Sequence, residues 1–258
     1  MMVPPQCEYA IFMCGNAGAG KSTLGNVLGA KFEAGFSLGE GLTKECQYAE
    51  TTIDGDSVLL IDAPGMYEAS VDITRQNARE IQKALGVQIP YKIAFVCASN
   101  GGRWKCDDAA MIDKVVLSIG SSESNGRETD YILIINQIQQ KEWSYYTHQP
   151  SLETMVGKLV AATTSKRTFA TTICCPYLPG DPSESAMLKA KLLSAFKMTV
   201  PSKIKVVQDI KAHPDDLKFY EKALIVILSP LWAPILGICA AFSSVKNRIL
   251  YNDWEPFI

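Results

Sequence analysis

The chain has 258 residues, of which 47% are hydrophobic and 20% charged, values typical of a globular protein rather than a disordered one. Its formal net charge of -2 argues against nucleic acid as a main partner, because binding phosphate backbones requires clustered Lys and Arg. The 8 scattered cysteines and 2 histidines argue against a disulfide framework and a zinc centre, and indicate a reducing, cytoplasmic setting.

The first half of the chain alternates strand and helix signals. An apolar run over Tyr9–Cys14 predicts a strand that enters a glycine-rich loop, and the helix after that loop is expected to end at Gly29. Residues 30–46 show no period and are expected to form a long loop. Strands are predicted over Cys46–Ile53 and Val58–Ile61, joined by Asp54-Gly55, a dipeptide typical of a hairpin turn.

The second half continues the alternation. Buried strands are predicted over Ile93–Ala98, Tyr131–Ile135 and Phe169–Cys174, and helices over about 72–86, 107–119, 152–163 and 184–198. One antiparallel hairpin inside a β-α-β series predicts an α/β fold, a doubly wound, mostly parallel sheet with helices on both faces. We expect this domain to cover residues 6–199, and a helical and hydrophobic C-terminal extension to cover residues 200–258.

The glycine-rich loop has the complete Walker A spacing, Gly15-x-x-x-x-Gly20-Lys21-Ser22. Glycines allow the backbone to curl so that successive N–H groups point at phosphate oxygens, and the following helix adds its positive N-terminal end. In such a loop the lysine reaches the β- and γ-phosphates and the Ser22 hydroxyl binds magnesium. A flexible glycine turn is the alternative, but the strand before and the helix after are the context that the motif requires.

Two further segments fit a nucleotide-binding site. Asp62-Ala63-Pro64-Gly65 follows a buried strand, where Asp62 could hold magnesium and the Gly65 N–H could approach the γ-phosphate. Thr43 lies in the long loop, where GTPases place a magnesium-binding switch threonine. The alternative for Asp62 is that it only begins a turn, and the alternative for Thr43 is that it is a surface hydroxyl.

Four stretches together resemble the AIG-type, or immune-associated nucleotide-binding, GTPases, called GIMAP proteins in vertebrates, whose G domains are related to those of septins and the chloroplast Toc import receptors. These stretches are GNAGAGKSTLGNVLG, GLTKECQ, LLIDAPGMYE and GGRWKCDDAA, the last resembling a box that Ras-like proteins lack. The resemblance covers about residues 8–199.

The resemblance implies a P-loop GTPase domain that binds GTP or GDP with Mg²⁺ and self-associates, as a homodimer or oligomer, through its nucleotide face. The implied metal ligands are Ser22, Thr43 and Asp62. The implied nucleotide-binding residues are Gly15, Asn16, Ala17, Gly18, Ala19, Gly20, Lys21, Ser22, Thr23, Thr43, Gly65 and Asn136.

The base-reading motif departs from the family pattern. A sequence related to N/T-K-x-D is expected after the strand Tyr131–Ile135, and the chain has Asn136-Gln137-Ile138-Gln139. The usual carboxylate accepts two hydrogen bonds from guanine, whereas Gln139 offers a single neutral acceptor, so discrimination against adenine should weaken. Whether Glu142 substitutes is left open by the sequence.

Hydrolysis is expected to be slow. The position after D-x-x-G, where Ras-type proteins carry a water-orienting Gln, is Met66. Lys21 and Arg103 are the candidate catalytic residues, with Arg103 supplied across a dimer to stabilise the transferring phosphoryl group. The alternative is that Arg103 is solvated or pairs with Asp107 and Asp108.

The segment Ala223–Phe242 is free of charges and about as long as a bilayer core requires. Pro230 and Pro234 would kink a helix there, and a bent helix packed on the domain is the alternative. The sequence thus predicts a slow, self-associating GTPase switch, attached by this segment to the cytosolic face of a membrane. A non-catalytic nucleotide-binding scaffold and a P-loop ATPase with relaxed base choice are the alternatives.

Overall fold

A computed structural model describes residues 7–35, 43–68, 70–119, 129–177, 182–204, 207–228 and 248–249. Its centre is a sheet in the order β2-β3-β1-β4-β5-β6-β7, in which all neighbours are parallel except β2 and β3. The strands are β1 (Tyr9–Cys14), β2 (Gln47–Ile53), β3 (Asp56–Asp62), β4 (Tyr91–Ala98), β5 (Tyr131–Ile138), β6 (Thr171–Pro176) and the short β7 (Arg248–Ile249). The predicted doubly wound, mostly parallel sheet is confirmed.

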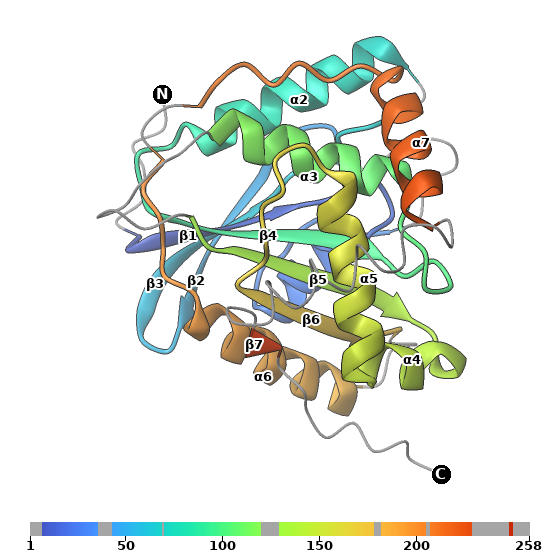
Figure 1. The fold of residues 1–258 in the computed structure, drawn as a ribbon. Helices are drawn as coiled ribbons and strands as arrows, with labels where there is room; N and C mark the ends of the chain where they lie inside the picture. Colours follow the sequence, from blue (N-terminus) through green and yellow to red (C-terminus); the bar gives the residue numbers. More distant parts are fainter. Residues whose placement is uncertain are drawn as a thin grey trace.

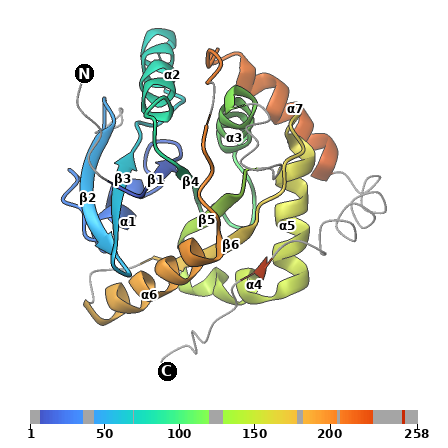
Figure 2. The same cartoon turned by 90° about the vertical axis from the view of Figure 1, so that its left-hand side faces the viewer.

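Helices cover both faces of the sheet (Figures 1 and 2). They are α1 (Lys21–Val27), α2 (Val71–Leu85), α3 (Cys106–Ile119), α4 (Trp143–Thr147), α5 (Gln149–Ala162), α6 (Pro182–Met198) and α7 (Asp216–Leu228), with a 3-10 turn over Gln140–Glu142. Helices α2, α3, α5 and α7 pack on one face, and α1 and α6 on the other. The four helices predicted between residues 72 and 198 are confirmed, whereas α4 was not predicted.

The hairpin at the sheet edge shows how local sequence fixes local structure. Asp54 and Gly55 have φ values of 55° and 99°, the positive values that a two-residue hairpin turn requires at both central positions. Asp and Gly tolerate this conformation better than most residues.

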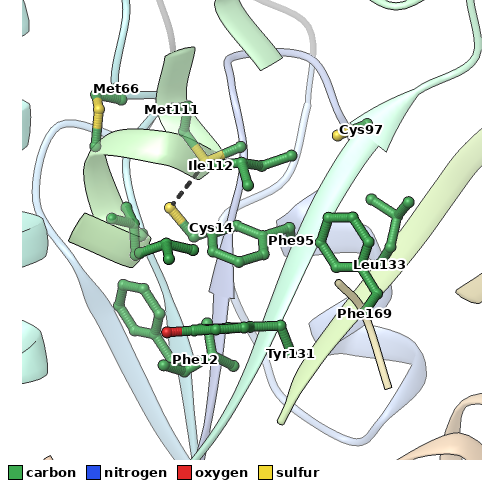
Figure 3. Close-up of a cluster of buried hydrophobic side chains, with 14 of the residues drawn as sticks. Phe12, Cys14, Met66, Phe95, Cys97, Met111, Ile112, Tyr131, Leu133 and Phe169 are labelled. Carbon is green, nitrogen blue, oxygen red and sulfur yellow. Dashed lines mark hydrogen bonds between the residues drawn. The ribbon is translucent and has the colours of Figure 1, made fainter. Parts of the chain in front are cut away.

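Alternation along β1 supplies both hydrophobic cores. Ile11 and Met13 face α1 and α6, whereas Phe12 and Cys14 face α2 and α3. Figure 3 shows the second core, in which Cys14 lies next to Met111 of α3. Since residues on both sides of β1 are buried, the strand is held rigidly where it delivers the glycine-rich loop.

The predicted C-terminal extension packs back on the domain over its described part. Helix α7 contacts α3 and α5, and the Tyr220 hydroxyl donates to Asp113 Oδ2 of α3 at 2.8 Å. Residues 223–228 of the predicted apolar segment form the end of α7, and residues 229–242 lie outside the described residues. In the described part of the chain, no helix is both long and apolar enough to cross a membrane.

Candidate phosphate-binding site

The glycine-rich loop leaves β1 and curls into the first turn of α1. Gly18 and Gly20 have φ values of 75° and 86°, in the left-handed region where a side chain would be strained. Gly15 is required for a different reason, since a Cβ there would lie 2.2 Å from the Val96 carbonyl oxygen. Glycine at these three positions thus makes a tight loop at the N-terminus of a helix.

Lys21 folds back over this loop. Its buried ammonium donates to the carbonyl oxygens of Gly15 at 2.9 Å and Asn16 at 3.1 Å. Burial lowers the pKa of Lys21, and the nearby Asp62 carboxylate opposes this shift. A buried cation enclosed by backbone dipoles is well placed to attract a phosphate anion.

Ser22 and Asp62 come together next to Lys21. The Ser22 hydroxyl donates to Asp62 Oδ2 at 2.5 Å, and Asp62 Oδ1 is buried without a hydrogen-bond partner. Burial raises the pKa of Asp62, while Lys21 and the Ser22 hydrogen bond oppose the shift. Parallel pairing of β1 with β3 explains the proximity, because both strands end at the same edge of the sheet.

The segment after Asp62 lies against the glycine-rich loop. A Cβ on Gly65 would lie 2.5 Å from the backbone nitrogen of Ala17, so the two backbones touch there. Asn77 of α2 holds this segment by donating to the Gly65 carbonyl oxygen at 2.6 Å. Met66 is fully buried and belongs to the hydrophobic cluster drawn in Figure 3.

The end of β5 is fastened to the same loop. Asn136 Nδ2 donates to the Ala19 carbonyl oxygen at 2.9 Å, and Gln137 Nε2 to that of Gly18 at 2.9 Å. Gln139 is exposed. Glu142 Oε2 accepts from the Ser99 hydroxyl at 2.8 Å and thus holds the loop after β4.

The remaining predicted site residues are exposed or half-buried. Ala17 and Thr23 are exposed at the loop and on the first turn of α1. Thr43 is half-buried and, among the described residues, makes no hydrogen bond to Ser22 or Asp62. Arg103 is exposed, and the described part of the chain shows no ion pair between it and Asp107 or Asp108.

Three contacts of the loop were missed from the sequence. The Asn16 side chain joins Asp108 of α3 to the Tyr67 backbone, and Gln137 binds the loop where a lysine was expected. The pairing of Asn16 with Asp108 spans 92 residues, so no local pattern could reveal it. Asp108 lies in the stretch GGRWKCDDAA that resembles the family, but there Arg103 was the suggested partner.

The fold and this loop define a P-loop nucleotide-binding protein with the topology of a GTPase domain. The model of the AIG1 family matches residues 9–125, which confirms the resemblance over that part of the chain. A dimerization-deficient mutant of Toc33 from Arabidopsis thaliana is 14% identical over 76% of this chain and 88% of that one, with a TM-score of 0.50. This likeness shows the fold.

Two further solved structures are similar at lower scores. Toc33 from Arabidopsis thaliana in complex with GDP and Mg²⁺ is 14% identical over 77% of this chain and 88% of that one, with a TM-score of 0.49. Era in complex with MgGDPNP and a segment of 16S ribosomal RNA is 19% identical over 73% of this chain and 57% of that one, with a TM-score of 0.47.

Proposed function

We propose that this protein binds GTP and GDP with Mg²⁺, hydrolyses GTP slowly and acts as a self-associating switch. The observation that carries the proposal is the arrangement of Lys21, Ser22 and Asp62 around one glycine-rich loop, with Ser22 and Asp62 joined at 2.5 Å. A buried ammonium suits the β- and γ-phosphates, and the hydroxyl–carboxylate pair suits a hard cation beside them.

The residues present fit magnesium. Mg²⁺ prefers oxygen ligands and is usually held by one or two carboxylates together with substrate phosphates. Asp62 Oδ1 is a buried acceptor without a partner, which a metal-bound water could satisfy. No cluster of three His, Cys, Asp or Glu side chains suited to a metal occurs in the described ranges. When bound, Mg²⁺ would neutralise phosphate charge, and Ser22 and Asp62 would hold it, with Thr43 as a third ligand.

Guanine is the proposed base because the sequence resembles AIG-type GTPases and because the similar Toc33 and Era structures contain guanine nucleotides. Asn136 is proposed to contact the base, and its hydrogen bond to the Ala19 carbonyl oxygen supports this role by holding it against the phosphate loop. Weak rather than strict selection of guanine is proposed, because Gln139 stands where the family motif carries a carboxylate and Glu142 Oε2 already accepts from Ser99.

Nucleotide titration tests this proposal directly. We expect calorimetry with Mg²⁺ to give dissociation constants for GTP and GDP that are lower than that for ATP. Lys21→Ala should abolish binding of all three, since the ammonium recognises phosphate rather than base. Tighter binding of ATP than of GTP by the wild-type protein would instead support the P-loop ATPase.

Slow hydrolysis follows from Met66, which is buried and cannot orient a water molecule. Arg103 is proposed to act across a dimer, since it is exposed and free of ion pairs to Asp107 and Asp108 in the described part of the chain. The turnover per molecule should then rise with protein concentration, and Arg103→Ala should remove this rise. Lys105→Ala is the matched control, because Lys105 is an exposed cation of the same loop. A rise that survives in Arg103→Ala would rule out this role.

A non-catalytic scaffold is the second candidate function. Met66 and Gln139 favour it, because Ras-type proteins carry a water-orienting Gln at the first position and the usual base-reading motif carries an Asp at the second. Tight GTP binding without turnover at any protein concentration would support it. Membrane attachment through residues 223–242 belongs to both functions and is tested by flotation with liposomes, in which a chain ending at residue 222 should no longer float.

A further inference from the structure

The Asn16 side chain lies where three parts of the site meet. Its Nδ2 donates to Asp108 Oδ1 of α3 at 3.1 Å, and its Oδ1 accepts from the Tyr67 backbone N–H at 3.4 Å. Asn16 and Asp108 are only 5% and 2% exposed. Both polar ends of one amide in the phosphate loop are therefore used to join α3 to the segment that follows Gly65.

Asp108 places a carboxyl group at a buried position where an apolar side chain would pack at lower cost. Its Oδ2 is buried without a hydrogen-bond partner, so the carboxyl group is only half satisfied. The groups that face it are Asn16 from the phosphate loop, the Cys97 thiol from β4, and Asp107 and Lys105 from its own helix end. Burial, followed by the charge of Asp107, raises the pKa of Asp108 to about 7. An apolar side chain would avoid this cost but could not hold Asn16.

We propose that Asn16 and Asp108 form a positioning pair that keeps the segment Gly65–Tyr67 ready for the third phosphate of a nucleoside triphosphate. The inference rests on the proposed nucleotide binding but not on the identity of the base. Gly65 is fixed on one side by Asn77, through its carbonyl oxygen, and Tyr67 on the other by Asn16.

The pair should act on triphosphate more than on diphosphate. Gly65 lies against Ala17 of the phosphate loop. From there the Gly65 N–H could approach the γ-phosphate, which a diphosphate lacks. Without the pair, the segment would have to be ordered when the triphosphate binds, and that ordering weakens binding. The phosphate contacts of Lys21 are shared by both nucleotides and should be little affected.

The test is the ratio of the dissociation constants for GDP and GTP, measured by calorimetry on the full chain with Mg²⁺. Asn16→Ala and Asp108→Leu should each lower the preference for GTP roughly tenfold, the effect of losing one hydrogen bond. The double variant should be no worse than either single one, since both remove the same link. Asp108→Asn keeps the shape and an acceptor oxygen and should restore the ratio to within about twofold of wild type.

Asp113→Asn is the control for general damage to α3. Asp113 is buried in the same helix but binds the backbone of Thr164 and Ser165 and the Tyr220 hydroxyl, away from the phosphate loop. It should lower the melting temperature while leaving the ratio unchanged. The inference would be overturned if the ratio stayed unchanged in both Asn16→Ala and Asp108→Leu. If Asp108→Leu does not fold, an unchanged ratio in Asn16→Ala alone would overturn it. Wild-type protein that binds no nucleotide would instead refute the proposed function, and this inference with it.

Discussion

Gly65 illustrates how a single residue sets the shape of the site. A Cβ there would lie 2.5 Å from the Ala17 backbone nitrogen, and backbone cannot move aside as a flexible side chain can. We therefore expect Gly65→Ala to displace the phosphate loop and to weaken GTP binding at least tenfold, an effect of ~1.4 kcal/mol or more. Calorimetry with GTP measures this loss.

Gly157→Ala is the matched control for Gly65→Ala. Gly157 lies within α5, and a Cβ there meets no atom within 4 Å. Because alanine favours helix more than glycine does, this change should stabilise the protein by up to ~1 kcal/mol and leave GTP affinity unchanged. Equal GTP affinities in the two variants would show that the close contact between Gly65 and Ala17 is not required for GTP binding.

The Asp108 carboxyl group should make stability depend on pH. Its pKa of about 7 lies above the ordinary value of 3.8, so between these values the folded state binds more protons than the unfolded state. The free energy of unfolding should therefore fall as pH rises from about 4 to about 7, by an amount of the order of 4 kcal/mol, and level off above pH 7.

Asp108→Asn isolates this contribution, because the other titrating groups are common to both proteins. Urea unfolding between pH 4.5 and 8 should show a falling difference in unfolding free energy, wild type minus variant, as pH rises. A difference that stays constant with pH would mean that Asp108 is ionised throughout and that its pKa is not raised.

At the scale of elements, α7 is joined to α3 through a buried carboxylate. Asp113 accepts hydrogen bonds from Tyr220 of α7 and from Thr164 and Ser165 in the turn after α5. Burial alone would raise the pKa of Asp113, but the hydrogen bonds from Thr164 and Ser165 outweigh it and lower the pKa. Tyr220→Phe removes one donor and should lower the unfolding free energy by ~1–3 kcal/mol. Hydrogen exchange should then quicken mainly in α7. Phe219→Leu is the control, since Phe219 is exposed, and it should change exchange little.

Most elements could be predicted because their signals are local. The hairpin at Asp54-Gly55 and the strand Tyr9–Cys14 follow from turn chemistry and from apolar runs, and both lie where expected. Helix α4 was missed because Trp143–Thr147 is too short to show a helical period. The glycine-rich loop was likewise predicted from its spacing, and it lies between β1 and α1 as expected. The partners of Asn16 and Gln137 were not, because they depend on strands brought together by the sheet.

At the scale of the whole molecule, the boundary at residue 199 suggested by composition does not coincide with the limit of the packed core. Ile210, Ala212, Tyr220 and Leu224 all lie in the same hydrophobic cluster as Phe12 and Phe95. Tyr67, close to the phosphate loop, also donates through its hydroxyl to Asp216 at 3.4 Å. The packing therefore favours one cooperative unit that extends through α7.

Truncation tests whether α7 belongs to that unit. A chain ending at residue 206 loses Ile210, Tyr220 and Leu224 from the core, and burying such side chains contributes ~1.5–3 kcal/mol each. We expect its unfolding free energy to be lower by at least ~3 kcal/mol than that of a chain ending at residue 228, with a smaller dependence on urea because less surface is buried. The longer chain is the right reference, since it keeps all the core side chains that the structure describes. Equal stability of the two would place the boundary near residue 199 and make α7 an appendage, whereas the expected difference would mean that α7 unfolds together with the sheet as part of one cooperative unit.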